Sequence, residues 1–169
     1  MPFLEGLKVI RSPIHGYGVI ALRPFKKGEI VCYGDGYLYH EDEEFDDNYA
    51  LVYSDDDDPN GEICRYLDLT DQTRWINHAC NPNTEVDTDI NPESGEPHAW
   101  WVALRDIKEG EELTYDYCFS GHLAEPCNCS DPICLGLIVD PDEVDEIPEK
   151  YQPLLKRERI PARKAAMDD

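Results

Sequence analysis

The residues whose spacing most clearly suits chemistry are three cysteines, Cys127, Cys129 and Cys134, which form a C-x-C-x4-C pattern. Three thiols so close in the chain cannot all pair as disulfides without strain. As thiolates they suit three corners of a tetrahedral zinc site. A fourth ligand must come from elsewhere, and Cys80 is the natural candidate because it lies among polar residues. The pattern favours a zinc site over three unmetallated thiols.

The other cysteines do not extend this cluster. Cys32 and Cys64 lie in apolar, strand-like contexts and are expected to be buried core thiols, whereas Cys118 is ambiguous. No apolar run approaches 18 residues, and the N-terminus lacks the apolar segment of a signal peptide. An intracellular protein with reduced thiols is therefore expected, which again favours metal binding over disulfides.

A second set of polar and aromatic residues could hold a ligand. Residues 74–83, RWINHACNPN, crowd three asparagines, an imidazole and a thiol beside an apolar pair. In residues 15–18, HGYG, two glycines let the backbone approach a ligand closely. The alternative is an ordinary tight turn, which can have the same sequence without binding a ligand. Tyr115 and Tyr117 alternate, which places both hydroxyls on one face of a strand. They could orient an amine, or they could be two core aromatics with satisfied hydroxyls.

Short strands must position these residues. Apolar runs of strand type punctuated by glycine turns predict a mostly β domain. A loop is expected at residues 55–61, DDDDPNG, and a short helix at residues 149–158. The predicted strands cover residues 9–10, 19–22, 30–33, 46–53, 99–104 and 112–117.

The charge is strongly acidic and uneven. The net charge is −22, and residues 35–62 hold twelve Asp or Glu with no Lys or Arg. A second acidic run covers residues 140–149, and a basic run follows at residues 156–164. Such a field repels nucleic-acid phosphates and attracts cationic partners. We therefore expect no direct nucleic-acid binding; the alternative for the acidic block is a solvated surface.

In their order along the chain, four of these motifs resemble those of the SET-domain protein-lysine N-methyltransferases. The family pattern is a G-x-G turn, then R-F-x-N-H-S-C-x-P-N, E-L-x-Y/F-D-Y and C-x-C-x4-C, and the resemblance covers about residues 7–137. It implies several small sheets around a threaded, pseudoknotted core, followed by a post-SET zinc segment. The implied division is a SET domain at residues 1–121, a zinc segment at 122–138 and an acidic, then basic, tail at 139–169.

The resemblance also implies roles for individual residues. The four zinc ligands would be Cys80, Cys127, Cys129 and Cys134. The catalytic tyrosine would be Tyr117, with Tyr115, Tyr49 and Tyr33 lining the lysine channel. Tyr33 departs from the pattern, because its segment CYGDG lacks both flanking glutamates of the family's E-Y-x-G-E. The S-adenosylmethionine contacts would be Gly16, Tyr17, Gly18, Tyr33, Arg74, Asn77, His78 and Tyr117.

The implied function is methyl transfer from S-adenosylmethionine to a lysine of a basic protein. A histone tail is the favoured substrate by family analogy. The alternatives are a non-histone protein substrate and an inactive SET module that binds peptides. Tyrosine at position 115 favours fewer methyl additions, and Lys164, in an Ala-Arg-Lys context, is a hypothetical site of automethylation. We expect no membrane association, and a nuclear location in a eukaryote or a cytoplasmic one in a bacterium.

Overall fold

The computed structural model describes residues 5–40, 42–44, 49–53 and 65–160. Short strands joined by turns and 3₁₀ helices dominate these ranges, so the predicted mostly β class is confirmed. The expected loop at residues 55–61, Cys64 and Lys164 lie outside the described residues.

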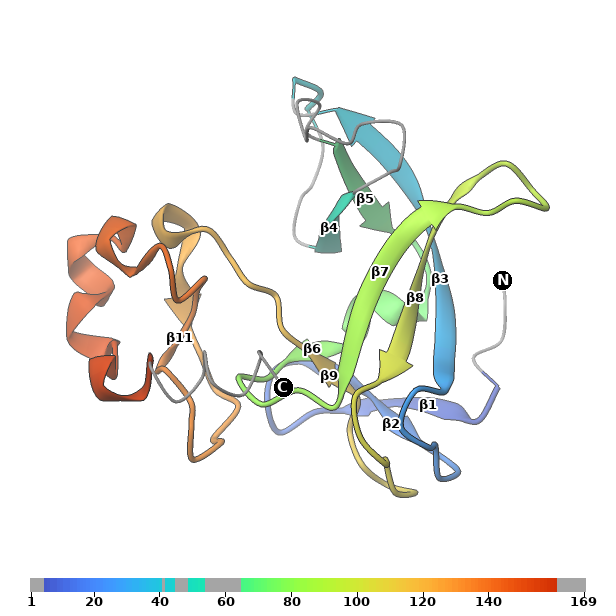
Figure 1. The fold of residues 1–169 in the computed structure, drawn as a ribbon, viewed down its shortest axis with the longest axis horizontal. Helices are drawn as coiled ribbons and strands as arrows, with labels where there is room; N and C mark the ends of the chain where they lie inside the picture. Colours follow the sequence, from blue (N-terminus) through green and yellow to red (C-terminus); the bar gives the residue numbers. More distant parts are fainter. Residues whose placement is uncertain (1–4, 41, 45–48, 54–64, 161–169) are drawn as a thin grey trace.

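The largest unit is a curved antiparallel sheet of five strands (Figure 1). Its alternating residues pack one face into the core: Ala99, Trp101 and Ala103 are buried, whereas the residues between them are partly exposed. Cys32 is also buried there, as expected for a core thiol. In spatial order the strands are β4 (Ala50–Tyr53), β5 (Arg65–Leu69), β3 (Ile30–His40), β8 (Pro97–Ala103) and β7 (Thr84–Ile90).

Two smaller pairings bring the motifs together. Strands β1 (Leu7–Arg11) and β2 (Tyr17–Ala21) form a hairpin whose connection carries the glycine-rich turn. Strands β6 (Asn77–His78) and β9 (Thr114–Tyr115) are parallel, with Asn77 opposite Thr114 and His78 opposite Tyr115. In Figure 1 these two strands lie between the five-stranded sheet and the C-terminal part of the chain.

The C-terminal part has a small core of its own. Six buried side chains form it: Ala124, Leu135, Leu137, Val139, Val144 and Ile147. The short helix expected at residues 149–158 is a pair of 3₁₀ segments, η5 (Glu149–Leu154) and η6 (Arg157–Arg159). Pro153 inside η5 has no N–H to donate, which disfavours a regular α-helix. The remaining elements are η3 (Gly121–Leu123), β10 (Glu125–Pro126), β11 (Leu137–Ile138) and η4 (Val144–Glu146), and η2 (Gln72–Trp75) precedes β6.

Gly136→Ala is expected to destabilise this C-terminal packing by about 1–3 kcal/mol. Gly136 has a φ of +85°, and a Cβ there would meet the carbonyl oxygen of Leu154. The matched control is Gly95→Ala, because Gly95 has a φ of +71° but nothing within 4 Å of its Cβ position. Chemical denaturation of both variants measures the difference. Equal losses would mean that the Leu154 contact is unimportant.

Candidate functional site

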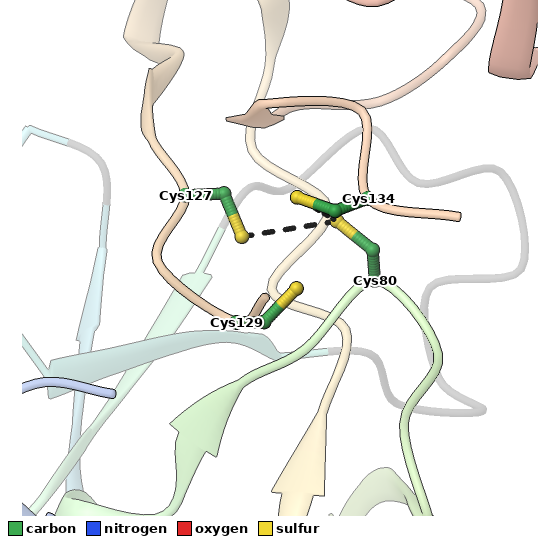
Figure 2. Close-up of side chains that lie close together, drawn as sticks. All are labelled: Cys80, Cys127, Cys129 and Cys134. Carbon is green, nitrogen blue, oxygen red and sulfur yellow. Dashed lines mark hydrogen bonds between the residues drawn. The ribbon is translucent and has the colours of Figure 1, made fainter. Parts of the chain in front are cut away.

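The four cysteines of the expected metal site lie together although Cys80 is far from the others in sequence (Figure 2). Their sulfur atoms all lie within 4.8 Å of one another. Cys80 Sγ is 3.8 Å from Cys127 Sγ and 3.7 Å from Cys134 Sγ. A tetrahedral site with Zn–S bonds of about 2.3 Å has sulfur–sulfur edges of about 3.8 Å. The cluster therefore has the donors and the dimensions of a structural zinc site.

The ionisation of these thiols shows why a cation suits the cluster. Sharing of protons among the sulfurs lowers the pKa of Cys129 and raises the pKa of Cys80 and of Cys127. A bound dication displaces such protons, because it stabilises the thiolates directly. Cys118 is exposed and lies outside the cluster, which resolves its ambiguous assignment.

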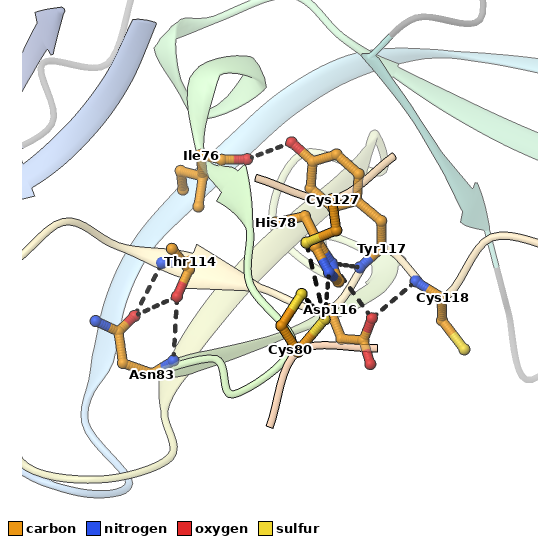
Figure 3. A network of polar contacts seen from close by, with 10 residues as sticks. Ile76, His78, Cys80, Asn83, Thr114, Asp116, Tyr117, Cys118 and Cys127 are labelled. Carbon is orange, nitrogen blue, oxygen red and sulfur yellow. Dashed lines mark hydrogen bonds and ion pairs between the residues drawn. The ribbon is translucent and has the colours of Figure 1, made fainter. Parts of the chain in front are cut away.

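His78 connects the metal cluster with the adjoining aromatic site (Figure 3). The backbone N–H of Tyr117 donates to His78 Nδ1 at 3.1 Å. The ring proton then belongs on Nε2, which lies 3.4 Å from Cys80 Sγ. The imidazole is almost fully buried, at 3% exposure. The His78 side chain thus contacts Cys80 of the metal site on one side and the backbone of Tyr117, in the segment Tyr115-Asp116-Tyr117, on the other.

Asn77 fixes the glycine-rich turn. Its Nδ2 donates to the carbonyl oxygens of Tyr17 at 2.8 Å and His15 at 3.2 Å, and to Glu112 Oε1 at 2.9 Å. Glu112 also accepts from Ser12 Oγ at 2.7 Å, so one carboxylate links the β1–β2 connection to Asn77. Glu112 was not among the site residues expected from the sequence. The available signal was its place as the first residue of the E-L-x-Y/F-D-Y motif, three residues before Tyr115.

A cavity of about 310 Å³ lies where these groups meet. This volume falls at the lower end of the range of small-molecule sites. Among the residues expected to bind a cofactor, six line the cavity: Gly16, Tyr17, Arg74, Asn77, His78 and Tyr117. Tyr49 lines it as well. The wall also includes residues that the sequence analysis did not single out: Ile14, Trp75, Phe119, Glu125, Pro126, Asn128 and Ile138.

Tyr117 is held at the cavity by both its backbone and its hydroxyl. The hydroxyl donates to the carbonyl oxygen of Ile76 at 2.9 Å. Its ring lies 4.7 Å from the ring of Tyr115, which is buried behind it. Burial raises the pKa of both phenols, so both hydroxyls stay protonated near neutral pH. They can donate and accept hydrogen bonds but do not act as ionised bases.

The remaining predicted residues differ in position. Arg74 stacks its guanidinium 4.1 Å from the centre of the Tyr49 ring, at the cavity wall. Gly18 does not line the cavity, but a Cβ there would meet the Glu112 carboxylate, so glycine is needed for that close approach. Tyr33 is not brought to the cavity: it is 53% exposed on the sheet, and its ring contacts His98.

A comparison with protein families identifies this arrangement. The model of the SET domain matches residues 16–118, which includes the glycine-rich turn, β6 and β9. The chain belongs to the SET-domain family. The fold agrees with this assignment, because the structure is similar to that of Arabidopsis thaliana SUVH6 in complex with SAM. The TM-score is 0.64 at 20% sequence identity, over 78% of this chain and 33% of SUVH6.

Curated relatives of this SET-domain chain include much longer proteins. It is 34% identical over 146 residues to the histone-lysine N-methyltransferase ash1 of Drosophila melanogaster, covering 79% of this chain and 6% of that protein. It is 35% identical over 147 residues to the human histone-lysine N-methyltransferase 2B, covering 77% of this chain and 5% of that protein. The chain therefore spans only a small part of these relatives. No helix among the described residues is long and apolar enough to cross a membrane.

Proposed function

We propose that this SET-domain protein is a protein-lysine N-methyltransferase that uses S-adenosylmethionine and acts on a histone tail. The observation that carries the proposal is the cavity where Asn77, His78 and Tyr117 meet beside a four-cysteine site. The family assignment and the similarity to histone-lysine N-methyltransferases support it. In a eukaryote such a protein would act in the nucleus. The proposed division is a catalytic domain at residues 1–121, a zinc segment at 122–138 and a C-terminal segment at 139–169.

The cofactor would be held by residues that line the cavity and are fixed by their neighbours. The donors and aromatic faces around the cavity fit a zwitterionic amino acid joined to a nucleoside. When bound, S-adenosylmethionine supplies an electrophilic methyl group on a sulfonium. The residues proposed to hold it are Gly16, Tyr17, Arg74, Asn77, His78 and Tyr117. The residues proposed to hold zinc are Cys80, Cys127, Cys129 and Cys134.

The chain must also present a lysine as a neutral amine. Free lysine has a pKa of about 10.4, so deprotonation costs about 4–5 kcal/mol at pH 7. Aromatic walls lower this cost because desolvation disfavours the ammonium form. Tyr117, Tyr115 and Tyr49 are proposed to form such walls. Since the Tyr117 hydroxyl stays protonated, its role is to orient the amine rather than to remove a proton.

Tyr115→Phe is expected to raise the proportion of di- and trimethylated product. Tyr115 is buried against Tyr117 and Trp101, so loss of its hydroxyl frees space beside the proposed amine position. Mass spectrometry of the product peptide under multiple-turnover conditions gives the distribution. The control is Tyr151→Phe, because Tyr151 packs on the separate C-terminal core. An unchanged distribution in Tyr115→Phe would remove this role.

The proposed activity is tested by incubating the full chain with tritiated S-adenosylmethionine and core histones. A labelled histone band supports the proposal. The same incubation is repeated with a cell lysate. If label appears there on a non-histone protein and not on histones, the protein is a methyltransferase whose substrate is not a histone. Cofactor binding without transfer to any protein would favour a peptide-binding SET module. Label only on the enzyme itself would direct attention to Lys164.

A further inference from the structure

The outer face of β3, β8 and β7 carries two rows of side chains that the proposed reaction does not use. In the antiparallel register, Tyr33 lies opposite Trp100, and Trp100 lies opposite Asp87. Two residues further along each strand, Asp35 lies opposite His98, and His98 lies opposite Asp89. Directly paired residues of a sheet point to the same face. We name these six residues the acidic aromatic face; its three strands lie side by side in Figure 1.

This face is turned away from the core. Gly34, Ala99 and Trp101, which alternate with it, are buried. Tyr33, Asp35 and Asp87 are exposed, and the other three members are partly exposed. None of the six lines the 310 Å³ cavity. The acidic aromatic face is therefore a surface separate from the candidate cofactor site.

The aromatic members form one continuous group. The Tyr33 and His98 rings are 6.0 Å apart in an edge-on arrangement, and the His98 and Trp100 rings are 5.2 Å apart. Nδ1 of His98 is buried and has no hydrogen-bond partner among the described residues. The group presents π faces, and electron-rich π faces attract Lys and Arg side chains.

The charged side chains on the strands that carry these rings are all acidic. Strands β3, β8 and β7 and the connection at residues 91–96 contain no Lys or Arg. They contain six acidic residues: Asp35, Glu85, Asp87, Asp89, Glu93 and Glu96. Carboxylates beside aromatic rings, without a competing internal cation in these strands, complement an extended cationic segment. An acidic face of this kind repels nucleic acid.

We propose that the acidic aromatic face is a docking surface for a Lys/Arg-rich segment of a partner protein. The side chains of that segment place their charges near Asp35, Asp87 and Asp89 and their stems over Trp100. This docking does not require methyl transfer. Its test is therefore independent of the proposed enzymatic function.

The test measures the fluorescence anisotropy of a labelled KRKGKRKG peptide with the zinc-loaded full chain at low ionic strength. Asp35→Asn/Asp87→Asn/Asp89→Asn is expected to weaken binding about tenfold, since each exposed charge pair contributes modestly. Trp100→Leu is expected to weaken it about threefold by removing the π face while retaining apolar area. A QQQGQQQG peptide is expected not to bind.

The matched control is Glu109→Gln/Asp145→Asn/Glu149→Gln, which changes the net charge by the same amount at exposed positions outside the face. If this control weakens binding as much as the face variant, attraction is due to net charge alone and the proposal fails. Absence of peptide binding by the unmodified chain would also overturn it. Sedimentation adds a third arm: self-association abolished by the face variant would assign the surface to a second copy of the chain instead.

Discussion

Removal of the metal is expected to unfold the segment of residues 121–160 while the five-stranded sheet stays folded. Among the described residues, six buried side chains form the C-terminal core, and β10 and β11 are two residues long. Such a small unit rarely folds without a disulfide or a structural metal. Zinc binding to small cysteine sites contributes on the order of 10 kcal/mol to folding. Hydrogen exchange measured by mass spectrometry, with and without a chelator, should therefore show fast exchange confined to this segment.

Variants separate this effect from general damage by the chelator. Cys134→Ser should reproduce the exchange pattern at normal zinc concentrations and lower the bound zinc. Cys118→Ser is the matched control, because Cys118 is exposed and lies outside the cluster. Partial desolvation of its sulfur and the nearby Asp140 carboxylate raise the pKa of the Cys118 thiol to about 11, so it is a neutral thiol near pH 7. Unchanged protection of residues 121–160 after complete zinc removal would show that the C-terminal core is self-sufficient.

Tyr117→Phe is expected to lower the rate of methyl transfer by on the order of 100-fold, the loss typical of one preorganised hydrogen-bond donor. The hydroxyl is fixed by Ile76, and the ring is packed by Tyr115, His78 and Phe119. Phenylalanine keeps that packing, so cofactor affinity should change by less than about threefold. Single-turnover transfer and calorimetric binding of S-adenosylmethionine measure the two quantities on one preparation.

The control for this variant is Tyr37→Phe, because Tyr37 is 67% exposed on the sheet and does not line the cavity. It should retain full activity and full cofactor binding. If Tyr117→Phe lost cofactor binding and transfer together, the hydroxyl would be a structural group of the cavity. If it lost neither, the orienting role would be wrong, and another tyrosine of the wall would have to supply it.

Local sequence patterns predicted the chemical groups of the site better than they predicted the strands and segments around it. The C-x-C-x4-C spacing indicated a metal site from thiol chemistry alone, and Cys80 was placed with it through its polar context. Strands β1, β2, β3 and β8 were predicted in part, because their apolar runs are continuous. The strand expected at residues 112–117 is limited to β9, because Glu112 forms only an isolated bridge with Ile20 and Tyr117 lines the cavity.

Long-range pairing could not be predicted. Strand β7, TEVDTDI, has few apolar residues and is held mainly by its pairing with β8. Tyr33 faces outward because the alternate position, Gly34, lies against Trp101 and Thr73, where a Cβ would collide. That direction depends on the register of β3 with β8, which a segment read alone does not define. The C-terminal core was likewise obscured, because acidic residues and prolines separate its apolar side chains.

The placement of His78 makes metal retention and occupancy of the cavity thermodynamically reciprocal. One imidazole lines the cavity, contacts Cys80 Sγ and accepts from the backbone of Tyr117. A ligand that stabilises this position of the His78 imidazole raises the affinity for zinc. Zinc raises the affinity for that ligand by the same factor. A cell short of zinc would therefore also lose ligand occupancy in this protein, because Glu125, Pro126 and Ile138 of the cavity wall lie in the segment that needs the metal.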